Sequence, residues 1–130
     1  MPGRDAAVSS GSALEDKVTA LAEGLGLESR RQYRAGRRLW GRERHIDIIL
    51  RDKKSQKTLG IECKYQGGAG TADEKIPSTI KDIEAWPIPG IVVFDGEGFE
   101  SMRPYLLSTG KAVEFPDLGN WLKLFFGLEL

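Results

Sequence analysis

Hydrophobic residues near the start of the chain recur at the spacing of an α-helix. After a stretch of small and polar residues, the apolar positions that fall on one helical side are Leu14, Val18, Leu21, Ala22 and Leu25. Ser12 is a suitable N-cap, Glu15 completes a capping box with it, and Gly24 or Gly26 ends the helix. The pattern therefore predicts a helix from Ser12, preceded by a disordered tail over residues 1–11.

The next segments have the patterns of β-strands. Residues 31–40 predict a twisted, basic strand, and Gly41 marks a turn. The apolar run 45–50 and the run 58–66 predict two further strands. The polar residues 52–57 between these two strands predict a hairpin loop.

The second half of the chain begins with a helical pattern and a buried strand. Thr71 and Glu74 form a second capping-box pattern, but Pro77 follows, so we expect the main helix to begin at Pro77. The apolar stripe of this helix consists of Ile76, Ile80, Ile83 and Trp86. The near-continuous apolar run 89–95 predicts a strand that is buried on both faces.

Three shorter elements complete the predicted order. Residues 98–108 predict a short helical stretch, residues 111–115 predict a last strand, and Asp117 is expected to cap a terminal helix. The resulting order is α-β-β-β-α-β followed by α, β and α. It predicts an α/β fold in which a mixed β-sheet is flanked by helices.

The length and composition are those of one globular domain. The chain has 130 residues, so we expect residues 12–130 to form a single domain. A single Cys excludes an internal disulfide framework and a Cys-rich zinc site. The sequence has neither an apolar stretch of membrane-spanning length nor an N-terminal signal sequence, so we expect a cytoplasmic protein.

The formal net charge of zero argues, by itself, against a nucleic-acid partner. Mapped along the chain, however, the net charge is −3 over residues 1–29, +8 over residues 30–64 and −5 over residues 65–130. The basic centre contains an arginine cluster, which consists of Arg30, Arg31, Arg34, Arg37, Arg38, Arg42 and Arg44. Arginine makes forked contacts with phosphate, so this cluster is a candidate nucleic-acid-binding surface. A solvated, charged β-ribbon is the alternative interpretation.

The hairpin between the second and third predicted strands carries the candidate chemistry. Side chains two residues apart on a strand share a face, which groups Glu62 with Lys64 and Gln66. The opposite face of that strand, toward the expected core, carries Ile61, Cys63 and Tyr65. On the preceding strand, one face is expected to carry His45, Asp47 and Ile49, and the other face Ile46, Ile48 and Leu50.

The register of this hairpin determines which of these side chains meet. If the turn is centred on Lys54 and Ser55, residues whose numbers sum to 109 face each other, and Asp47 lies opposite Glu62. Directly opposed residues lie about 4.5–5.5 Å apart at Cβ, where like charges are destabilising. Two such carboxylates form the core of a Mg²⁺ site, to which the Cys63 carbonyl can add a further oxygen.

Lys64 adds a cation on the Glu62 face. Its ammonium group can hold or deprotonate an attacking water, or neutralise charge that develops on phosphorus. The alternative is purely structural, namely an ion-pair ladder of Asp47, Lys64 and Glu62 on a solvent-facing strand.

Asp47 is followed, after fourteen residues, by Glu62-Cys63-Lys64 on the adjacent predicted strand. With a Glu-bearing helix before them, these residues resemble the PD-(D/E)XK nuclease superfamily. Gln66 extends the motif to E-x-K-x-Q.

The resemblance covers about residues 12–95. The predicted element order matches the restriction-endonuclease-like αβββαβ core of that superfamily. The segment GTADEKI, residues 70–76, is similar to a segment that follows the catalytic strand in restriction-endonuclease-like members.

The resemblance implies an endonuclease that hydrolyses DNA phosphodiester bonds with a metal-activated water, of a restriction-like, homing or junction-resolving kind. The metal is Mg²⁺, with Mn²⁺ as a substitute. The metal-binding carboxylates map to Asp47 and Glu62, and the catalytic lysine maps to Lys64. Gln66 would orient the water or contact a phosphate. Glu15 stands where many members add a Glu from the first helix, although it also fits a capping role.

Three further interpretations remain open. Lys75 is either another phosphate contact or an exposed helix lysine. A non-catalytic nucleic-acid-binding module with the same fold is the alternative to an enzyme, and an interaction protein would rest on the terminal helix alone. That helix is apolar over much of its circumference, which predicts a homodimer or higher homo-oligomer; its apolar residues are Trp121, Leu122, Phe125, Phe126, Leu128 and Leu130.

Overall fold

The computed structural model describes residues 11–37, 43–65, 72–96, 99 and 103–128, with the backbone alone for residues 32–37, 43–45 and 72–77. Almost all of the predicted tail, residues 1–10, lies outside this range. The elements are α1 (Gly11–Gly24), β1 (Glu28–Arg37), β2 (Glu43–Arg51), β3 (Thr58–Tyr65), α2 (Ala72–Glu84), β4 (Gly90–Asp95), α3 (Arg103–Ser108), β5 (Ala112–Glu114) and α4 (Phe115–Phe126).

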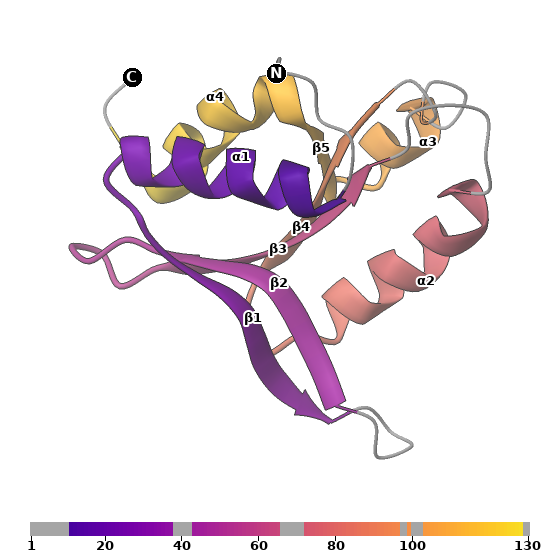
Figure 1. Cartoon of the computed structure of the whole chain (residues 1–130), viewed down its shortest axis with the longest axis horizontal. Coiled ribbons are helices and arrows are strands. Elements are labelled where there is room, and N and C mark those ends of the chain that lie inside the picture. Colours follow the sequence, from indigo (N-terminus) through magenta and orange to yellow (C-terminus); the bar gives the residue numbers. More distant parts are fainter. Residues whose placement is uncertain (1–10, 38–42, 66–71, 97–98, 100–102, 129–130) are drawn as a thin grey trace.

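The strands form one five-stranded sheet in the order β1-β2-β3-β4-β5. The first three strands pair antiparallel, whereas β3–β4 and β4–β5 pair in parallel. Helices α1 and α4 cover one face of the sheet, and α2 lies on the other (Figure 1). The predicted mixed sheet flanked by helices is therefore confirmed.

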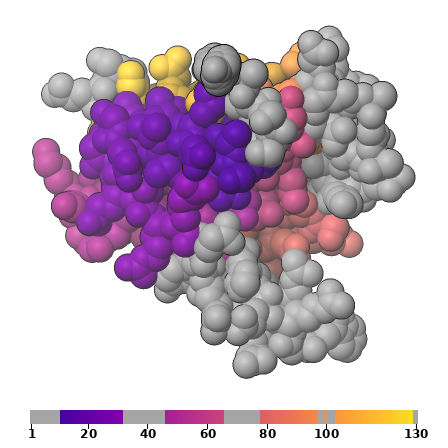
Figure 2. All heavy atoms as spheres, viewed as in Figure 1, coloured from indigo at the N-terminus to yellow at the C-terminus, as the bar shows by residue number. Residues whose placement is uncertain are grey.

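Two hydrophobic clusters hold these layers together, one on each face of the sheet. The first joins α1 and α4 to the sheet, and its fully covered members include Leu14, Val18, Ile48, Ile61, Leu118 and Leu122. The second lies under α2 and α3, and its members include Ile46, Ile80, Ile83, Trp86, Phe94 and Leu106. Seen with all atoms drawn, α1 and the start of β1 form one continuous surface (Figure 2).

The predicted register of the β2–β3 hairpin is correct as far as the two strands pair, but the ladder ends before the expected pair of Asp47 and Glu62. The pairs run from Arg51–Thr58 to Ile48–Ile61, and each pair sums to 109. Ile61 and Cys63 enter the first cluster, with Tyr65 packed against it, as the alternation predicted.

The predicted faces of β2 are wrong at one residue. Ile48 and Leu50 enter the first cluster, but Ile46 enters the second cluster, on the α2 side, together with the partly buried Ile49. The strand bends strongly on its way to the β1–β2 turn (Figure 1), and this bend rotates Ile46 out of the simple two-residue alternation.

Several predicted helix starts are also wrong. Helix α1 begins at Gly11, so Ser12 lies inside the helix and is not its N-cap. Helix α2 begins at Ala72 and continues through Pro77, because one proline removes only one backbone hydrogen bond while Ile80 and Ile83 pack against the sheet.

The start of α4 differs as well. The N-cap position is Glu114, which makes no side-chain capping bond, and Asp117 lies within the first turn. The helix ends at Gly127, whose backbone is left-handed at φ 70° and whose N–H donates to the Lys123 carbonyl. Within the described ranges, none of the helices is both long and apolar enough to cross a membrane.

A glycine pair under Trp86 lets α2 approach the sheet closely. Gly60 on β3 pairs with Gly90 on β4. A Cβ atom on Gly60 would lie 2.8 Å from Cζ3 of Trp86 and 3.2 Å from Cγ2 of Ile46. The indole, which is 7 % exposed, therefore packs directly on the backbone of the two central strands.

We expect Gly60→Ala to destabilise the protein by about 1–3 kcal/mol, because the added methyl group overpacks the space under Trp86. Chemical denaturation, with the indole fluorescence followed, measures the loss. Gly119→Ala in α4 is the matched control, because its Cβ would lie at an ordinary 3.7 Å from Leu21. An alanine in a helix is about 1 kcal/mol better than glycine. Equal effects of the two substitutions would contradict the packing argument.

Candidate active site

The candidate site lies where β2 separates from β3. Beyond the pair Ile48–Ile61, the Asp47 side chain continues the contact between the two strands: the backbone N–H of Cys63 donates to Oδ2 of Asp47 over 2.9 Å. A carboxylate thus accepts the hydrogen bond that a strand carbonyl accepts in a regular ladder. The bond fixes Asp47 beside the Glu62-Cys63-Lys64 segment, as the sequence motif requires.

Glu62 and Lys64 project from the same face of β3, as expected for residues two apart. Nζ of Lys64 lies 3.6 Å from Oε2 of Glu62. The Glu62 side chain is 22 % exposed and that of Lys64 is 33 % exposed, so both are partly desolvated but open to a ligand. The ion pair fits both a catalytic site and a purely structural ion-pair ladder, so on its own it does not distinguish these two interpretations.

Both carboxylates hold their protons more tightly than usual. Burial raises the pKa of Glu62 to about 7, with a further contribution from the charge of Asp47. Burial likewise raises the pKa of Asp47, and the charge of Glu15 adds to this, whereas the bond from Cys63 opposes it. Lys64 favours the charged form of both carboxylates without cancelling the shift. The site therefore has a deficit of positive charge.

A divalent cation fits this donor set. Asp47 and Glu62 offer carboxylate oxygens, and Mg²⁺ commonly takes one or two carboxylates and keeps several waters. The N–H and C=O of a strand residue point to the same edge, so the Cys63 carbonyl lies on the Asp47 side of β3. Within the described part of the chain, no group of three or more His, Cys, Asp or Glu side chains is arranged to hold a metal. Any metal would thus rely on waters or substrate for its remaining ligands.

Helix α1 brings Glu15 to the edge of this site. Its side chain is only 13 % exposed, and its charge acts on Asp47. Oε1 of Glu15 lies 3.0 Å from Nη2 of Arg31 on β1, so the carboxylate turns toward the sheet and not back toward Ser12. The capping role predicted for Glu15 is therefore wrong, and its position is compatible with the role implied by the resemblance.

The remaining predicted residues are placed only in part. Arg30 is exposed on β1, and Arg31 pairs with α1. The backbone alone is described for Arg34, Arg37, Arg44 and Lys75, while Arg38, Arg42 and Gln66 lie outside the described residues.

The sequence did not single out two acidic residues near the site. Asp82 on α2 raises the pKa of Glu62 through its charge, and Asp16 on α1 binds Arg31. Asp16 is next to Glu15 in the sequence, which is a usable signal. Asp82 carries no such signal, because its position depends on how α2 packs against the sheet, where it contacts β4.

One hollow of the described surface lies away from the two carboxylates. A cavity of about 440 Å³ opens between β1, β2 and the segment at Pro87 and Ile88, with Ile46 and Ile49 in its lining. Neither Asp47 nor Glu62 lines it. Asp47 and Glu62 lie, partly buried, beyond the last pair of the β2–β3 ladder.

Comparisons with known proteins agree with this geometry. A family model described as a PD-(D/E)XK nuclease superfamily domain matches residues 6–112, a range that includes Glu15, Asp47, Glu62 and Lys64. No curated protein matches the sequence. The fold is similar to the crystal structure of AF1548, a protein of unknown function, with a TM-score of 0.56 and 18 % identity. That match covers 78 % of this chain and 56 % of AF1548, so the chain spans little more than half of that protein.

We expect Glu62→Gln to stabilise the metal-free protein at pH 8. The pKa of Glu62 rises from 4.5 to about 7 on folding. Stability from this group is therefore full below about pH 4.5 and is lost as the pH rises through about 7, because the unfolded chain ionises first. The neutral amide removes that loss, which is on the order of 3 kcal/mol. Thermal unfolding in EDTA between pH 4 and pH 8 measures the difference.

Glu84→Gln is the control for this substitution, because Glu84 lies at an exposed position on α2. Its unfolding free energy should stay within about 0.5 kcal/mol of the wild type at both ends of the pH range. A Glu62→Gln protein that unfolds at or below the wild-type temperature at pH 8 would show that burial of this carboxylate is not costly.

Proposed function

Because the chain belongs to the PD-(D/E)XK nuclease superfamily, we propose that it is a Mg²⁺-dependent endonuclease that hydrolyses DNA phosphodiester bonds. The observation that carries the proposal is the bond from the Cys63 N–H to Asp47, which fixes one acidic residue beside Glu62 and Lys64. The proposed endonuclease is of a restriction-like, homing or junction-resolving kind. Mn²⁺ is proposed as a substitute metal.

In this proposal Asp47, Glu62 and the Cys63 carbonyl hold the metal. The raised pKa of Glu62 supports this assignment, because a cation between the two carboxylates would offset the charge that now opposes ionisation. When bound, the metal supplies a water of lowered pKa and offsets charge on the oxygens of the phosphate.

Lys64 acts on the attacking water and on the phosphate. Its ammonium group, 3.6 Å from Glu62 and one-third exposed, can donate hydrogen bonds to a water and to a phosphoryl oxygen at once. Because the ion pair with Glu62 already holds the ammonium group in place, little side-chain entropy is lost when it binds the reacting groups. It therefore orients the nucleophile and stabilises the charge that grows on phosphorus. Gln66 is proposed to assist with the water or a nearby phosphate, and Glu15 to join the site from α1.

The basic segment is proposed to hold the DNA beside this site. Arg30 is exposed on β1, and Arg34, Arg37 and Arg44 follow on β1 and β2 toward their turn. Arg38, Arg42 and Lys75 belong to the same proposed surface. Such contacts make affinity fall steeply with salt.

A second copy of the chain is the proposed protein partner, because cutting both DNA strands requires two sites. Most of the apolar face of α4 packs against the sheet, with Leu118, Leu122 and Phe126 buried. Leu124, however, is 71 % exposed, beside the stacked rings of Trp121 and Phe125. This part of α4 is the surface that a dimer contact would use.

We expect Lys64→Met to reduce Mg²⁺-dependent DNA cleavage by about 100-fold or more, because the loss removes a charge that acts on the reacting groups. Nicking of supercoiled plasmid and cutting of branched DNA, with Mg²⁺ or with EDTA, measure the rate. Lys81→Met on α2 is the matched control, because Lys81 is exposed and its removal should leave cleavage unchanged.

Undiminished cleavage by Lys64→Met would disprove this mechanism. If the wild type binds DNA but cleaves none of these substrates with Mg²⁺ or Mn²⁺, the chain is instead a non-catalytic nucleic-acid-binding module. Where the wild type does cleave, Asp47→Ala should abolish the cleavage, because Asp47 is a proposed metal ligand.

We expect Leu124→Glu to shift the chain from dimer to monomer, since a charge at the centre of an apolar contact is costly to bury. Size-exclusion chromatography with light scattering at several concentrations measures the mass. Leu107→Glu on α3, 48 % exposed, is the matched control and should leave the mass unchanged. A wild-type protein that stays monomeric at all concentrations would rule out the dimer.

A further inference from the structure

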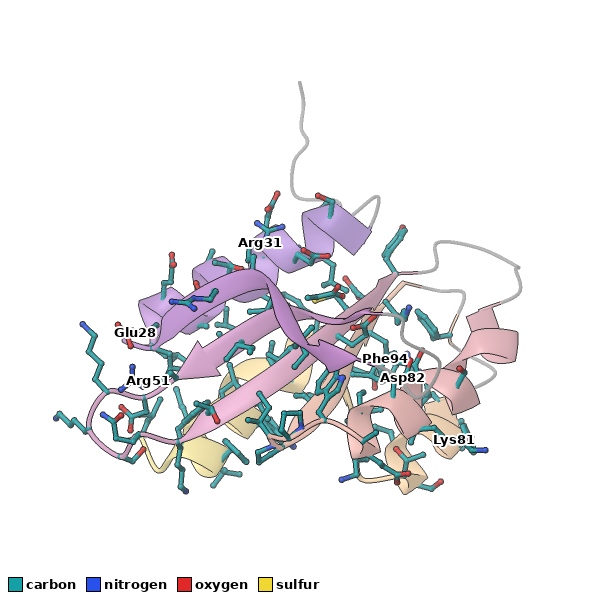
Figure 3. All side chains as sticks on the ribbon, turned by 90° about the horizontal axis from the view of Figure 1, so that it is seen from below. Glu28, Arg31, Arg51, Lys81, Asp82 and Phe94 are labelled. Carbon is teal, nitrogen blue, oxygen red and sulfur yellow. The ribbon has the colours of Figure 1, made fainter. Side chains whose placement is uncertain are left out.

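Arg31 joins β1 to α1 immediately beside the candidate site. Its Nη2 lies 3.0 Å from Oε1 of Glu15 and its Nη1 lies 2.6 Å from Oδ1 of Asp16, so both arms of the guanidinium are engaged. Figure 3 shows Arg31 at α1, away from Asp82 and the other face of the sheet. Arg31 belongs to the basic segment by sequence, but in this structure its guanidinium pairs with the carboxylates of Glu15 and Asp16.

We propose that Arg31 links DNA binding to metal binding: in the free protein it holds Glu15 away from the metal, and a DNA phosphate that takes the guanidinium releases Glu15 to the site. The inference rests on the proposed function, since it assumes a metal between Asp47 and Glu62. It makes Arg31 a positioning residue, which acts through Glu15.

Three observations support this link. The Arg31 side chain is 35 % exposed, so a phosphate can reach it without unfolding the protein. Glu15 is only 13 % exposed and its charge acts on Asp47 and on Cys63, so a released carboxylate is already close to the metal ligands. The charge of Arg31 itself also acts on Asp47.

When a DNA phosphate replaces Glu15 as a partner of Arg31, the guanidinium keeps an anionic partner. Phosphate accepts forked hydrogen bonds from guanidinium as a carboxylate does, so Arg31 exchanges one anion for another. Glu15 then loses the positive charge of Arg31, and a metal at Asp47 and Glu62 would supply positive charge in its place. Metal and DNA should therefore raise each other's affinity, because linkage is reciprocal.

The first test is Mn²⁺ titration by calorimetry without DNA, which needs no enzymatic activity. We expect Arg31→Met to bind Mn²⁺ roughly fivefold more tightly than the wild type, because one nearby positive charge and one competitor for Glu15 are gone. Arg51→Met is the matched control: it also pairs with a carboxylate, Glu28, over 3.7 Å, but at the far end of the hairpin (Figure 3). It should bind Mn²⁺ as the wild type does.

A double-mutant cycle separates release of Glu15 from a general effect of charge. In a Glu15→Gln background, Arg31→Met should give a clearly smaller gain in Mn²⁺ affinity, because only the loss of one positive charge near Asp47 remains. An equal gain in that background would overturn the inference, and so would an Arg31→Met protein that binds Mn²⁺ no more tightly than the wild type. Absence of Mn²⁺ binding in every variant would overturn it together with the metal site. Thermal unfolding of each variant verifies that the fold is retained.

The second test adds a short DNA duplex in the Lys64→Met background, so that the DNA survives the titration. DNA should raise Mn²⁺ affinity more in Lys64→Met than in Lys64→Met/Arg31→Met, where only direct contact between phosphate and metal would remain. An equal rise in both proteins would overturn the link. If the Lys64→Met protein still cleaves DNA, the proposed mechanism fails, whereas the titrations without DNA still decide the role of Arg31.

Discussion

The hydrogen bond from the Cys63 N–H to Asp47 is the interaction on which the candidate site depends. An antiparallel hairpin pairs every second N–H with a carbonyl, and here a side chain accepts one of these bonds where β2 turns away from β3. The substitution lets the strands diverge without leaving the amide unpaired. It also places a carboxylate at the mouth of the opening it creates.

Because side chains alternate along β3, one face of the strand packs in the core and the other carries the candidate catalytic residues. Ile61 and Cys63 point into the cluster under α1 and α4, whereas Glu62 and Lys64 point away from it. The same strand is therefore anchored by one face and exposes its polar groups on the other. Asp47 and Glu62 are themselves partly buried, and this burial raises the pKa of both carboxylates. The site is thus costly to the metal-free fold and suited to a cation.

The sequence was sufficient for the element order and for the hairpin register, because both follow from local periodicity and one short loop. It failed where tertiary packing decides. The bend of β2 moved Ile46 to the α2 side, packing of Ile80 and Ile83 carried α2 past Pro77, and Arg31 drew Glu15 away from a capping role. Asp82 acts on Glu62 only because of how α2 packs on the sheet, where it contacts β4, the neighbour of β3. Motif residues on one hairpin were therefore predictable, whereas contributions from the two flanking helices were not.

The candidate site combines residues from one hairpin with residues from the two flanking helices. Asp47, Glu62 and Lys64 are fixed by one hairpin, and their relative positions survive small movements of the helices. Glu15 and Asp82 arrive on α1 and α2, from opposite faces of the sheet, so their distances to Asp47 and Glu62 depend on how each helix packs. The arginine that ties α1 to β1 is accessible to solvent. A ligand that alters this tie changes the charge around a rigid core of three residues, and so tunes the site without rebuilding it.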